Sequence, residues 1–304
     1  MIWKRDWGLV GRQTVAWLVM LAIYAAIIAV AFAFLKGGVL YFILALVFIM
    51  AFVQFFFSDK IVLKTMHVQM VDEYSQPKLV AMVRGLAEEA GLPMPKVGVI
   101  MHPAMTNIPN AFATGRSPRH AVVAVTPRIM ELLNEKELRG VLAHEISHIR
   151  NRDMLTMTIG SFAVMIAEVI LHNSFFIALF GGMRDSNEGP GVIAYILLIV
   201  VTFLIYIIGT MVTMAISRYR EFAADRGSGY ITQDPDSLIS ALRKLSDASE
   251  HAPQKAKEAV SGLNAFFITP AISGKSVMEL FSTHPTLEKR IENLEKVRRE
   301  IRGY

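Results

Sequence analysis

Two histidines and a glutamate stand at a spacing that suits a hydrolytic metal site. Residues 141–149 read VLAHEISHI, so His144 and His148 lie four positions apart and Glu145 directly follows the first histidine. In a helix this spacing puts both imidazoles on one face, where they can bind the same metal ion. Glu145 can then reach a water molecule on that ion without being a ligand. The motif predicts a zinc site with Glu145 as general base, provided that a third ligand exists.

A third ligand is available in residues 217–225, which read SRYREFAAD. Glu221 and Asp225 lie four positions apart and therefore on one helical face. We predict that Glu221 completes a set of two histidines and one carboxylate that binds one zinc ion per chain. Asp225 is predicted to accept the free ring N–H of a ligand histidine and to fix its tautomer. Asp153 is a weaker candidate for that supporting role, since it could instead mark the turn into the membrane.

The composition indicates a membrane protein with a polar part rather than a soluble enzyme. Of the 304 residues, 53% are hydrophobic and 19% are charged; three long apolar runs carry no charge and a fourth carries a single glutamate. The net charge of +5 is spread along the chain without a basic motif that contains aromatic residues, which argues against a nucleic-acid partner. No cysteine is present, so a metal must be held by histidines and carboxylates.

The apolar runs predict four membrane helices in two hairpins, because each run is long enough to cross about 30 Å of hydrocarbon. They are residues 14–35, 39–57, 154–180 and 191–216. Lysines and arginines gather at the outer ends of both hairpins and are fewer in the loops inside them. By the positive-inside rule, we expect a multi-pass protein of the inner (plasma) membrane with both termini and the predicted zinc site in the cytoplasm.

The charge pattern divides the chain into four predicted segments. They are a first membrane hairpin (1–57), the first part of a catalytic domain with the histidine helix (58–152), a second membrane hairpin (153–216) and the second part of the catalytic domain with the third ligand (217–304). The expected fold class is α+β, mainly α: four membrane helices in two hairpins plus a cytoplasmic domain with a small β-sheet.

The soluble segments contain shorter periodic patterns. Strands are predicted at 96–101, 110–114 and 120–126, and helices at 77–90, 135–149, 234–246 and 285–301. Asn134 and Glu137 have the spacing of a capping box for the helix that carries the histidines. This helix is flanked by charged residues, so we do not expect it to span the membrane.

These motifs together resemble the HtpX family of membrane-integrated zinc metallopeptidases, in the gluzincin group that also contains the CAAX prenyl proteases. The resemblance covers nearly the whole chain, and no ligand position departs from the family pattern. Besides the two hairpins it rests on Asn110–Phe112, His144–His148, Asn151–Asp153, Glu221–Asp225, and Ser282–Pro285 with Arg290. It implies a zincin-like endopeptidase of protein quality control and the stress response, which cleaves misfolded or damaged membrane proteins at the bacterial inner membrane.

Two further features are candidates for a part in catalysis. One segment reads as an edge strand along which an unfolded or membrane-protein substrate would pair by main-chain hydrogen bonds: Asn110, Ala111, Phe112 and Ala113. His284 is also a candidate catalytic residue. It either stabilises the oxyanion, occupies the fourth position of zinc in a resting state, or is a turn residue before Pro285.

Glu168 and His172 lie four positions apart within the third apolar run. A charge at the centre of the bilayer costs about 2.5–3.5 kcal/mol on insertion scales. The two residues are therefore interpreted as a mutually satisfied pair, or as a sign that this segment is not fully immersed in lipid. A second functional site is a further interpretation.

Three other functions stay open at this point. An intramembrane site-2-like protease carries the same histidine motif, but within an apolar span, whereas charged residues flank the motif here. A membrane scaffold or transporter would also have four spans, but it would give the two separate halves of the zinc signature no reason to occur together. A CAAX-type prenyl-peptide protease is the third alternative, on grounds of resemblance.

Overall fold

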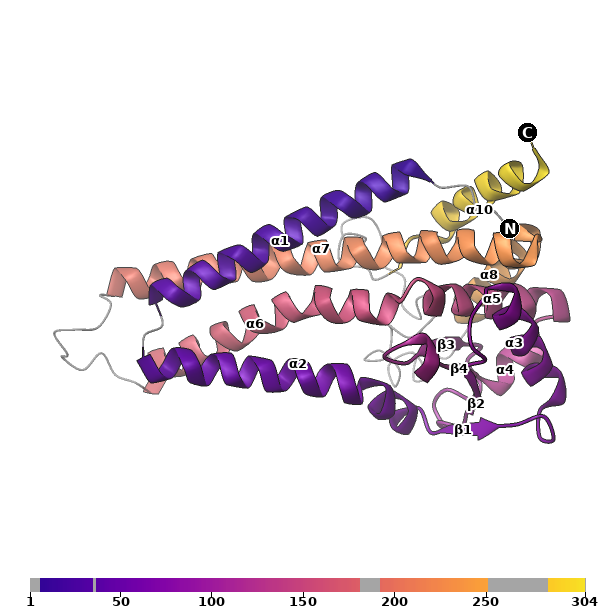
Figure 1. Ribbon diagram of the computed structural model, residues 1–304, viewed down its shortest axis with the longest axis horizontal. Helices are drawn as coiled ribbons and strands as arrows, with labels where there is room; N and C mark the ends of the chain where they lie inside the picture. The colour runs from indigo at the N-terminus through magenta and orange to yellow at the C-terminus, as the bar shows by residue number, and fades with distance from the viewer. Residues whose placement is uncertain (1–5, 35–36, 181–191, 251–283, 304) are drawn as a thin grey trace. The chain divides into compact units, whose positions relative to one another are not determined.

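The computed structural model describes residues 6–34, 37–180, 192–250 and 284–303 (Figure 1). Helices dominate these ranges, and four of them are long and apolar enough to cross a membrane. A four-stranded sheet completes the fold. The predicted fold class, mainly α with four membrane helices and a small sheet, is confirmed.

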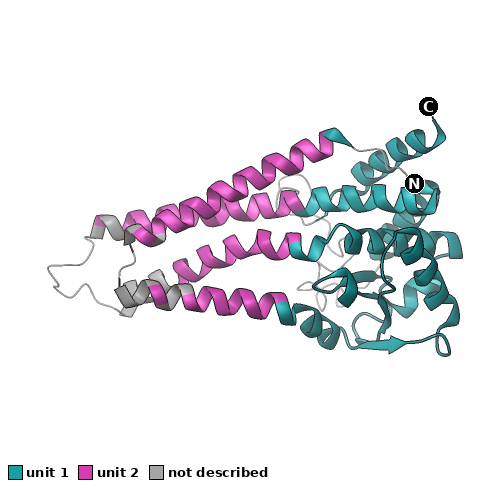
Figure 2. Ribbon diagram, viewed as in Figure 1, with its two compact units in different colours: residues 1–7, 56–155, 217–304 teal, residues 8–55, 156–216 magenta. Residues whose placement is uncertain are grey.

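The chain divides into two compact units, which Figure 2 shows in different colours. The first unit contains residues 1–7, 56–155 and 217–304, and the second contains residues 8–55 and 156–216. Each unit is therefore assembled from segments that are distant in the sequence. All predicted zinc ligands belong to the first unit.

The second unit is built from the apolar parts of four helices: α1 (Trp7–Phe34), α2 (Gly37–Thr65), α6 (Asp153–Phe180) and α7 (Val192–Thr232). Polar side chains join pairs of these helices. Thr213 donates a hydrogen bond to the Gly160 carbonyl at 3.0 Å, and Gln54 donates to Ser161 Oγ at 3.1 Å. Because no water in hydrocarbon can replace such partners, these bonds favour the helix pairing seen here.

Glu168 and His172 are both exposed on α6. The contact between them runs from His172 Nδ1 to the main-chain carbonyl oxygen of Glu168, 3.3 Å away. The helix backbone, rather than the Glu168 carboxylate, is therefore the partner of this imidazole nitrogen.

α7 is a single helix of 41 residues. At 1.5 Å per residue it is about 60 Å long, roughly twice the thickness of a hydrocarbon core. Its apolar part ends near Ile216 in the second unit, and the remainder carries Glu221 and Asp225 in the first unit. The two predicted site residues thus stand on the polar continuation of a membrane helix.

The sheet belongs to the first unit and has the strand order β1-β2-β4-β3. Its strands are β1 (Val68–Val71), β2 (Lys96–Ile100), β3 (Ala111–Thr114) and β4 (Val122–Val125). β2 and β4 are parallel, whereas β1 and β3 run antiparallel to their neighbours. The sequence does not predict β1, because its four residues show no alternation and follow α2 closely. β3 lies at one edge of the sheet.

Two elements differ from the prediction beside β4. The predicted strand at 120–126 begins only at Val122, because Pro118–His120 forms a 3-10 turn. The short helix α4 (Pro127–Leu132) follows the strand, and Thr126 caps it by accepting from Ile129 N. With six residues, this helix is too short for a periodic pattern to reveal it.

The core of the first unit brings helices together with the sheet. α3 (Pro77–Glu89) and α5 (Glu135–Arg150) pack against strands, and α8 (Pro235–Glu250) packs against α5. Its largest fully buried apolar side chains include Leu86, Leu142, Ile146, Leu238 and Leu242. Burial of such side chains is the main force that drives folding. Because most of α5 is buried, the core fixes the position of the histidines that this helix carries.

The C-terminal helix α10 (Leu287–Arg302) forms as predicted, and polar residues join the apolar ones on its buried face. The apolar spacing predicts a stripe that includes Leu287 and Ile291, which are only partly buried. The buried residues are Arg290, Asn293, Leu294 and Val297. The buried face therefore includes an arginine and an asparagine, whose partners come from other elements.

α5 begins with the predicted capping box. Glu137 N donates to Asn134 Oδ1 at 3.0 Å, and Asn134 N donates to the Glu137 carboxylate at 2.9 Å. The same carboxylate accepts from Ser240 Oγ at 2.6 Å and from Lys244 Nζ at 2.8 Å, both on α8. Burial by itself would raise the pKa of Glu137, but these hydrogen bonds outweigh it and lower the pKa. Glu137 thus ties the start of the histidine helix to α8.

α5 ends at a turn that redirects the chain into α6. Arg152 adopts a φ of 55°, in the left-handed region, which costs a non-glycine residue about 1–2 kcal/mol. The turn brings Asp153, the first residue of α6, back towards the last turn of α5. Asp153 can therefore contact His148, which a straight continuation of the helix would not allow.

Substitution of Glu137 by Gln should destabilise the detergent-solubilised protein by about 1–3 kcal/mol, because an amide cannot accept all three hydrogen bonds that the carboxylate accepts. Since the folded-state pKa is lowered, the stabilisation is present above the unfolded-state pKa and is lost as the pH falls through the folded-state pKa. Thermal unfolding should therefore show a gap between wild type and variant that narrows on acidification. Glu135→Gln, at an exposed position in the same helical turn, is the control. Equal losses of stability in the Glu137 and Glu135 variants would contradict the role of Glu137 in joining α5 to α8.

Candidate metal centre

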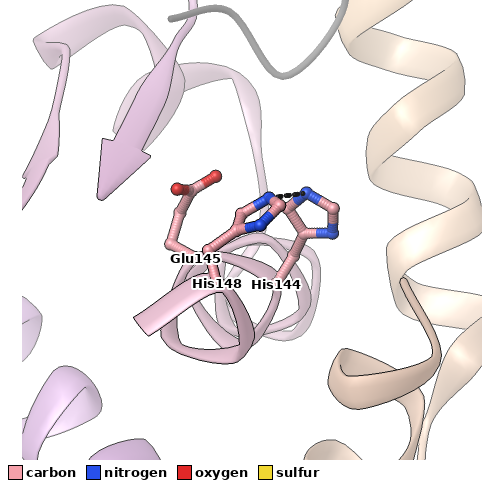
Figure 3. Close-up of side chains that lie close together, drawn as sticks. All are labelled: His144, Glu145 and His148. Atoms are coloured by element: carbon pink, nitrogen blue, oxygen red, sulfur yellow. Dashed lines mark hydrogen bonds between the residues drawn. The ribbon is translucent and has the colours of Figure 1, made fainter. Parts of the chain in front are cut away.

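His144 and His148 face each other on α5, with 3.1 Å between their Nε2 atoms (Figure 3). The carboxylate of Glu221 on α7 lies against both rings. One of its oxygens is 3.5 Å from His144 Nε2, and the other is 3.5 Å from His148 Nε2. The first unit therefore brings the three predicted ligands together, although a membrane hairpin separates them in the sequence.

The spacing of these donor atoms fits a metal ion. Ligand atoms that share a tetrahedral ion at about 2.0–2.2 Å lie about 3.4 Å apart, and the measured separations are 3.1, 3.5 and 3.5 Å. Glu221 Oε2 is buried and accepts no hydrogen bond from the described residues. A buried carboxylate oxygen that accepts no hydrogen bond is available as a ligand for a metal ion, which would compensate for its lost hydration. Two imidazoles and a carboxylate are also ligands that divalent transition metals prefer.

Each histidine has a carboxylate beside its other ring nitrogen. His144 Nδ1 is 3.0 Å from Asp225 Oδ1, and His148 Nδ1 is 2.5 Å from Asp153 Oδ2. An acceptor at this place keeps the proton on Nδ1 and leaves Nε2 for a metal. Burial would lower the pKa of His144, but the nearby carboxylates of Asp225 and Glu221 outweigh burial and raise it to about 9.

Glu145 is buried, and its side chain projects away from the two facing imidazoles (Figure 3). Its carboxylate oxygen still lies within 4.8 Å of their ligand atoms, and it interacts with the main-chain N–H of Ala113 on β3. Burial is the main cause that raises the pKa of Glu145. A carboxylate with a raised pKa is a better proton acceptor near neutral pH. The position between the histidines and the edge strand suits a general base.

Arg290 on α10 is a site residue that the sequence analysis does not single out as functional. It is 2% exposed, and its Nε and Nη2 donate to the two oxygens of Asp225 at 2.9 and 2.6 Å. Nη1 also lies 3.6 Å from Glu221 Oε2. Burial would lower the pKa of Arg290, but Asp225 outweighs burial and raises it. The sequence signal for this residue is an arginine on the buried face of an amphipathic helix, one turn before Leu294.

His284 is also brought into the site. It is 7% exposed, and its Nδ1 lies 3.4 Å from Glu221 Oε2. Arg220, which precedes Glu221 on α7, lies at the other side, with Nε 3.5 Å from Asp153 Oδ2. Basic side chains thus flank the carboxylates that surround the two histidines.

The four residues predicted to bind substrate differ in their surroundings. Asn110 is buried, and its carbonyl accepts from Thr126 N at 2.8 Å. Ala111 and Phe112 are buried in two separate hydrophobic clusters. Ala113 is partly exposed and lines a cavity of ≈ 420 Å³ that reaches His148. Ala113 is therefore the one of the four that lies at an open surface.

Comparison with known proteins identifies the family. Residues 73–298 match the family described as Peptidase family M48. This range contains every residue of the site described above. The chain belongs to peptidase family M48. It is therefore a metallopeptidase, with the His144, Glu145 and His148 group as a site that could hold the metal ion.

Relatives of this M48 peptidase match over nearly its full length. Protease HtpX homolog 2 of Methanosarcina acetivorans is 44% identical over 98% of this chain and 98% of its own. The HtpX homolog of Moorella thermoacetica is 41% identical over 97% of this chain and 96% of its own. The crystal structure of S. mikatae Ste24p shares the fold with a TM-score of 0.55 and 20% sequence identity. The match covers 93% of this chain and 64% of the Ste24p chain, so this chain spans less than two thirds of that protein. The resemblance to HtpX proteins is confirmed, and the four apolar helices make the chain a multi-pass membrane protein.

Asp153→Asn should weaken metal affinity by about 10–100-fold, because an amide no longer holds His148 in the ligand tautomer as a carboxylate does. The measurement is competition with a chelator on detergent-purified protein. Asp236→Asn, which removes an acidic group at a partly exposed surface ion pair on α8, is the matched control. Unchanged affinity in the Asp153 variant would show that this contact does not support the metal.

Arg290→Met should destabilise the protein by about 3–5 kcal/mol, because it leaves the Asp225 carboxylate buried without its cation. Neutralising that carboxylate as well, in Arg290→Met/Asp225→Asn, should restore part of the loss. Thermal unfolding of the wild type, the two single variants and the double variant gives the coupling free energy. Strictly additive losses would contradict a buried ion pair.

Proposed function

We propose that this M48 peptidase is a zinc-dependent endopeptidase of the cell inner membrane that hydrolyses misfolded or damaged membrane proteins, and so serves protein quality control under stress. The observation that carries the proposal is the convergence of His144, His148 and Glu221 at 3.1–3.5 Å, with Glu145 beside them. The names of the relatives, all HtpX proteases, support the same activity.

In this proposal each side chain of the site has a defined task. His144, His148 and Glu221 would hold one zinc ion per chain, and Asp225 and Asp153 keep the imidazoles in the ligand tautomer. When bound, zinc polarises the scissile carbonyl and lowers the pKa of a water molecule.

Glu145 is the general base. It takes a proton from the attacking water and then transfers it to the amine leaving group, which requires one group that changes protonation state twice. Its burial supports this task, because burial makes the carboxylate easier to protonate.

His284 is assigned to the transition state. Its position 3.4 Å from Glu221 Oε2 puts the imidazole at the border of the ligand set. From there an N–H can point to the negative charge that develops on the carbonyl oxygen, and such a donor stabilises a tetrahedral transition state.

The edge strand β3 provides a place for the substrate. An extended chain that pairs with the edge of a sheet is bound through its main chain, which every polypeptide shares. A site of this kind accepts many sequences, as a protease that removes damaged membrane proteins must. The carbonyl to be cleaved would then lie next to Glu145, whose carboxylate already touches Ala113.

The charge pattern supports a cytoplasmic site. Basic residues stand at the first-unit ends of the membrane helices, among them Lys60 and Lys64 on α2 and Arg218 and Arg220 on α7. By the positive-inside rule, this pattern supports the proposal that the first unit, with both termini, lies on the cytoplasmic side. The lipid bilayer and polypeptide chains are the expected partners.

The two proteolytic alternatives can be separated from this proposal. α5, which carries both histidines, is not one of the candidate spans found in the described residues, which weakens the intramembrane alternative. The prenyl-peptide alternative predicts faster cleavage of prenylated than of unmodified peptides, and the two can be compared directly on the purified protein.

Glu145→Gln should keep near-stoichiometric zinc but lose proteolysis by about 10²–10⁴-fold, because it removes the base and leaves the ligands in place. The measurement is zinc content and cleavage of an unfolded membrane protein by the detergent-purified enzyme, with Glu221→Ala as the variant that should lose zinc. Glu135→Gln changes an exposed glutamate of the same helix and serves as control. Preserved cleavage in the Glu145 variant would exclude the mechanism and favour a non-enzymatic role.

A further inference from the structure

Three arginines line the cavity that adjoins the metal centre. Arg116 and Arg119 follow the edge strand β3, and Arg152 stands in the turn between α5 and α6. The cavity has a volume of ≈ 420 Å³ and also reaches His148 and Ala113. Whatever binds there therefore lies within reach of both the metal ligands and the edge strand.

These arginines have no carboxylate partner among the residues that the structure describes. The acidic residue that lines the cavity, Asp153, already contacts His148 at 2.5 Å and Arg220 at 3.5 Å. Arg119 and Arg152 are exposed and Arg116 is half-buried, whereas the buried Arg226 of the same unit is paired with Glu300 at 2.8 Å. The cavity thus combines a concave shape with an uncompensated positive charge, which attracts an anion.

The side chain of Arg116 and the backbone of Arg152 have distinct surroundings at the cavity. The Arg116 guanidinium lies over the Phe56 ring, 6.0 Å from its centre, and the residue is half-buried. Arg152 adopts a left-handed φ of 55°, a conformation that glycine or asparagine would adopt with less strain. Backbone strain of this kind is often found at functional sites.

We propose that this arginine cavity, formed by Arg116, Arg119 and Arg152, binds a carboxylate of the peptide substrate and gives the peptidase a preference for acidic residues near the scissile bond. The inference rests on the proposed proteolytic function. A guanidinium matches a carboxylate with two parallel hydrogen bonds, so a single acidic group can be recognised without contacts to its neighbours. The carboxylate comes either from an Asp or Glu side chain or from the C-terminus of the substrate.

A peptide fits this cavity better than a lipid headgroup does. The cavity wall includes Ala113 and Thr114 at the end of the edge strand, where an extended peptide would pair, and His148 of the ligand set. A carboxylate in the cavity would therefore be attached to a chain whose peptide bond already lies beside Glu145. Main-chain pairing would bind any sequence, and the arginines would select among positions along it.

Cleavage of matched peptides tests the preference. The full-length, zinc-loaded enzyme is given a neutral peptide in which one glutamate is moved through successive positions, with glutamine at the same positions for comparison. At one or two positions we expect kcat/KM to be about tenfold higher for glutamate, the size of one charge-assisted hydrogen bond. The ratio of kcat/KM for the glutamate peptide to kcat/KM for the glutamine peptide should fall towards one in the double variant Arg116→Gln/Arg119→Gln. It should stay at the wild-type value in Arg128→Gln, which changes an exposed arginine on α4 outside the cavity.

Binding provides a readout that does not depend on turnover. In the Glu145→Gln background, fluorescence anisotropy should show tighter binding of the glutamate peptide than of the glutamine peptide, with a difference that salt reduces. The double arginine variant should remove this difference. Peptides with a free or an amidated C-terminus, both without internal acids, show whether the carboxylate can also come from the chain end.

Several outcomes would overturn the inference. Equal binding and cleavage of acidic and neutral peptides by the wild type would exclude it, and so would a preference that survives in the double variant. If the double arginine variant lost activity equally on all peptides, and only when the enzyme was in vesicles with anionic lipids, the cavity would be assigned to lipid headgroups instead. Absence of cleavage with every peptide would reject the proposed function. The binding comparison would still show whether the cavity binds a carboxylate.

Discussion

The buried ion pair of Asp225 and Arg290 is the contact on which the site depends. Asp225 has no exposed surface, and a carboxylate at such a place is stable only when partners replace its lost hydration. Arg290 supplies two hydrogen bonds, and His144 Nδ1 lies 3.0 Å from the same carboxylate. Because Asp225 stands on α7, Arg290 on α10 and His144 on α5, one buried charge fixes three helical segments of the first unit.

Carboxylates and basic side chains alternate from this pair through the site. The Glu221 carboxylate lies near Arg290, His144, His148 and His284, and Asp153 lies near His148 and Arg220. Such a network is rigid only when every member is satisfied, since an unpaired group is costly in a medium of low dielectric. The buried oxygen of Glu221 that accepts no hydrogen bond from the described residues is the place where a metal cation would complete the network.

The body of the histidine helix and its C-terminal end have different surroundings. One side packs into the core with α8 and the sheet, so the imidazoles are held by side chains that cannot move independently. At the C-terminal end of the helix, His148 and Ile149 line the arginine cavity, where we propose that a substrate chain binds. The turn at Arg152 separates these two environments and returns Asp153 to the histidines.

Local patterns were enough to find the membrane helices, the histidine helix with its capping box, and the acids at Glu221 and Asp225. These features follow from hydrophobic length and from the 3.6-residue period of a helix, which act over a few neighbouring residues. The contacts of Arg290 and His284, the buried face of α10, strand β1 and the arginine cavity were decided only by the tertiary structure. Each of them depends on segments that are far apart in the sequence, and no spacing within one segment records which distant partner it will meet.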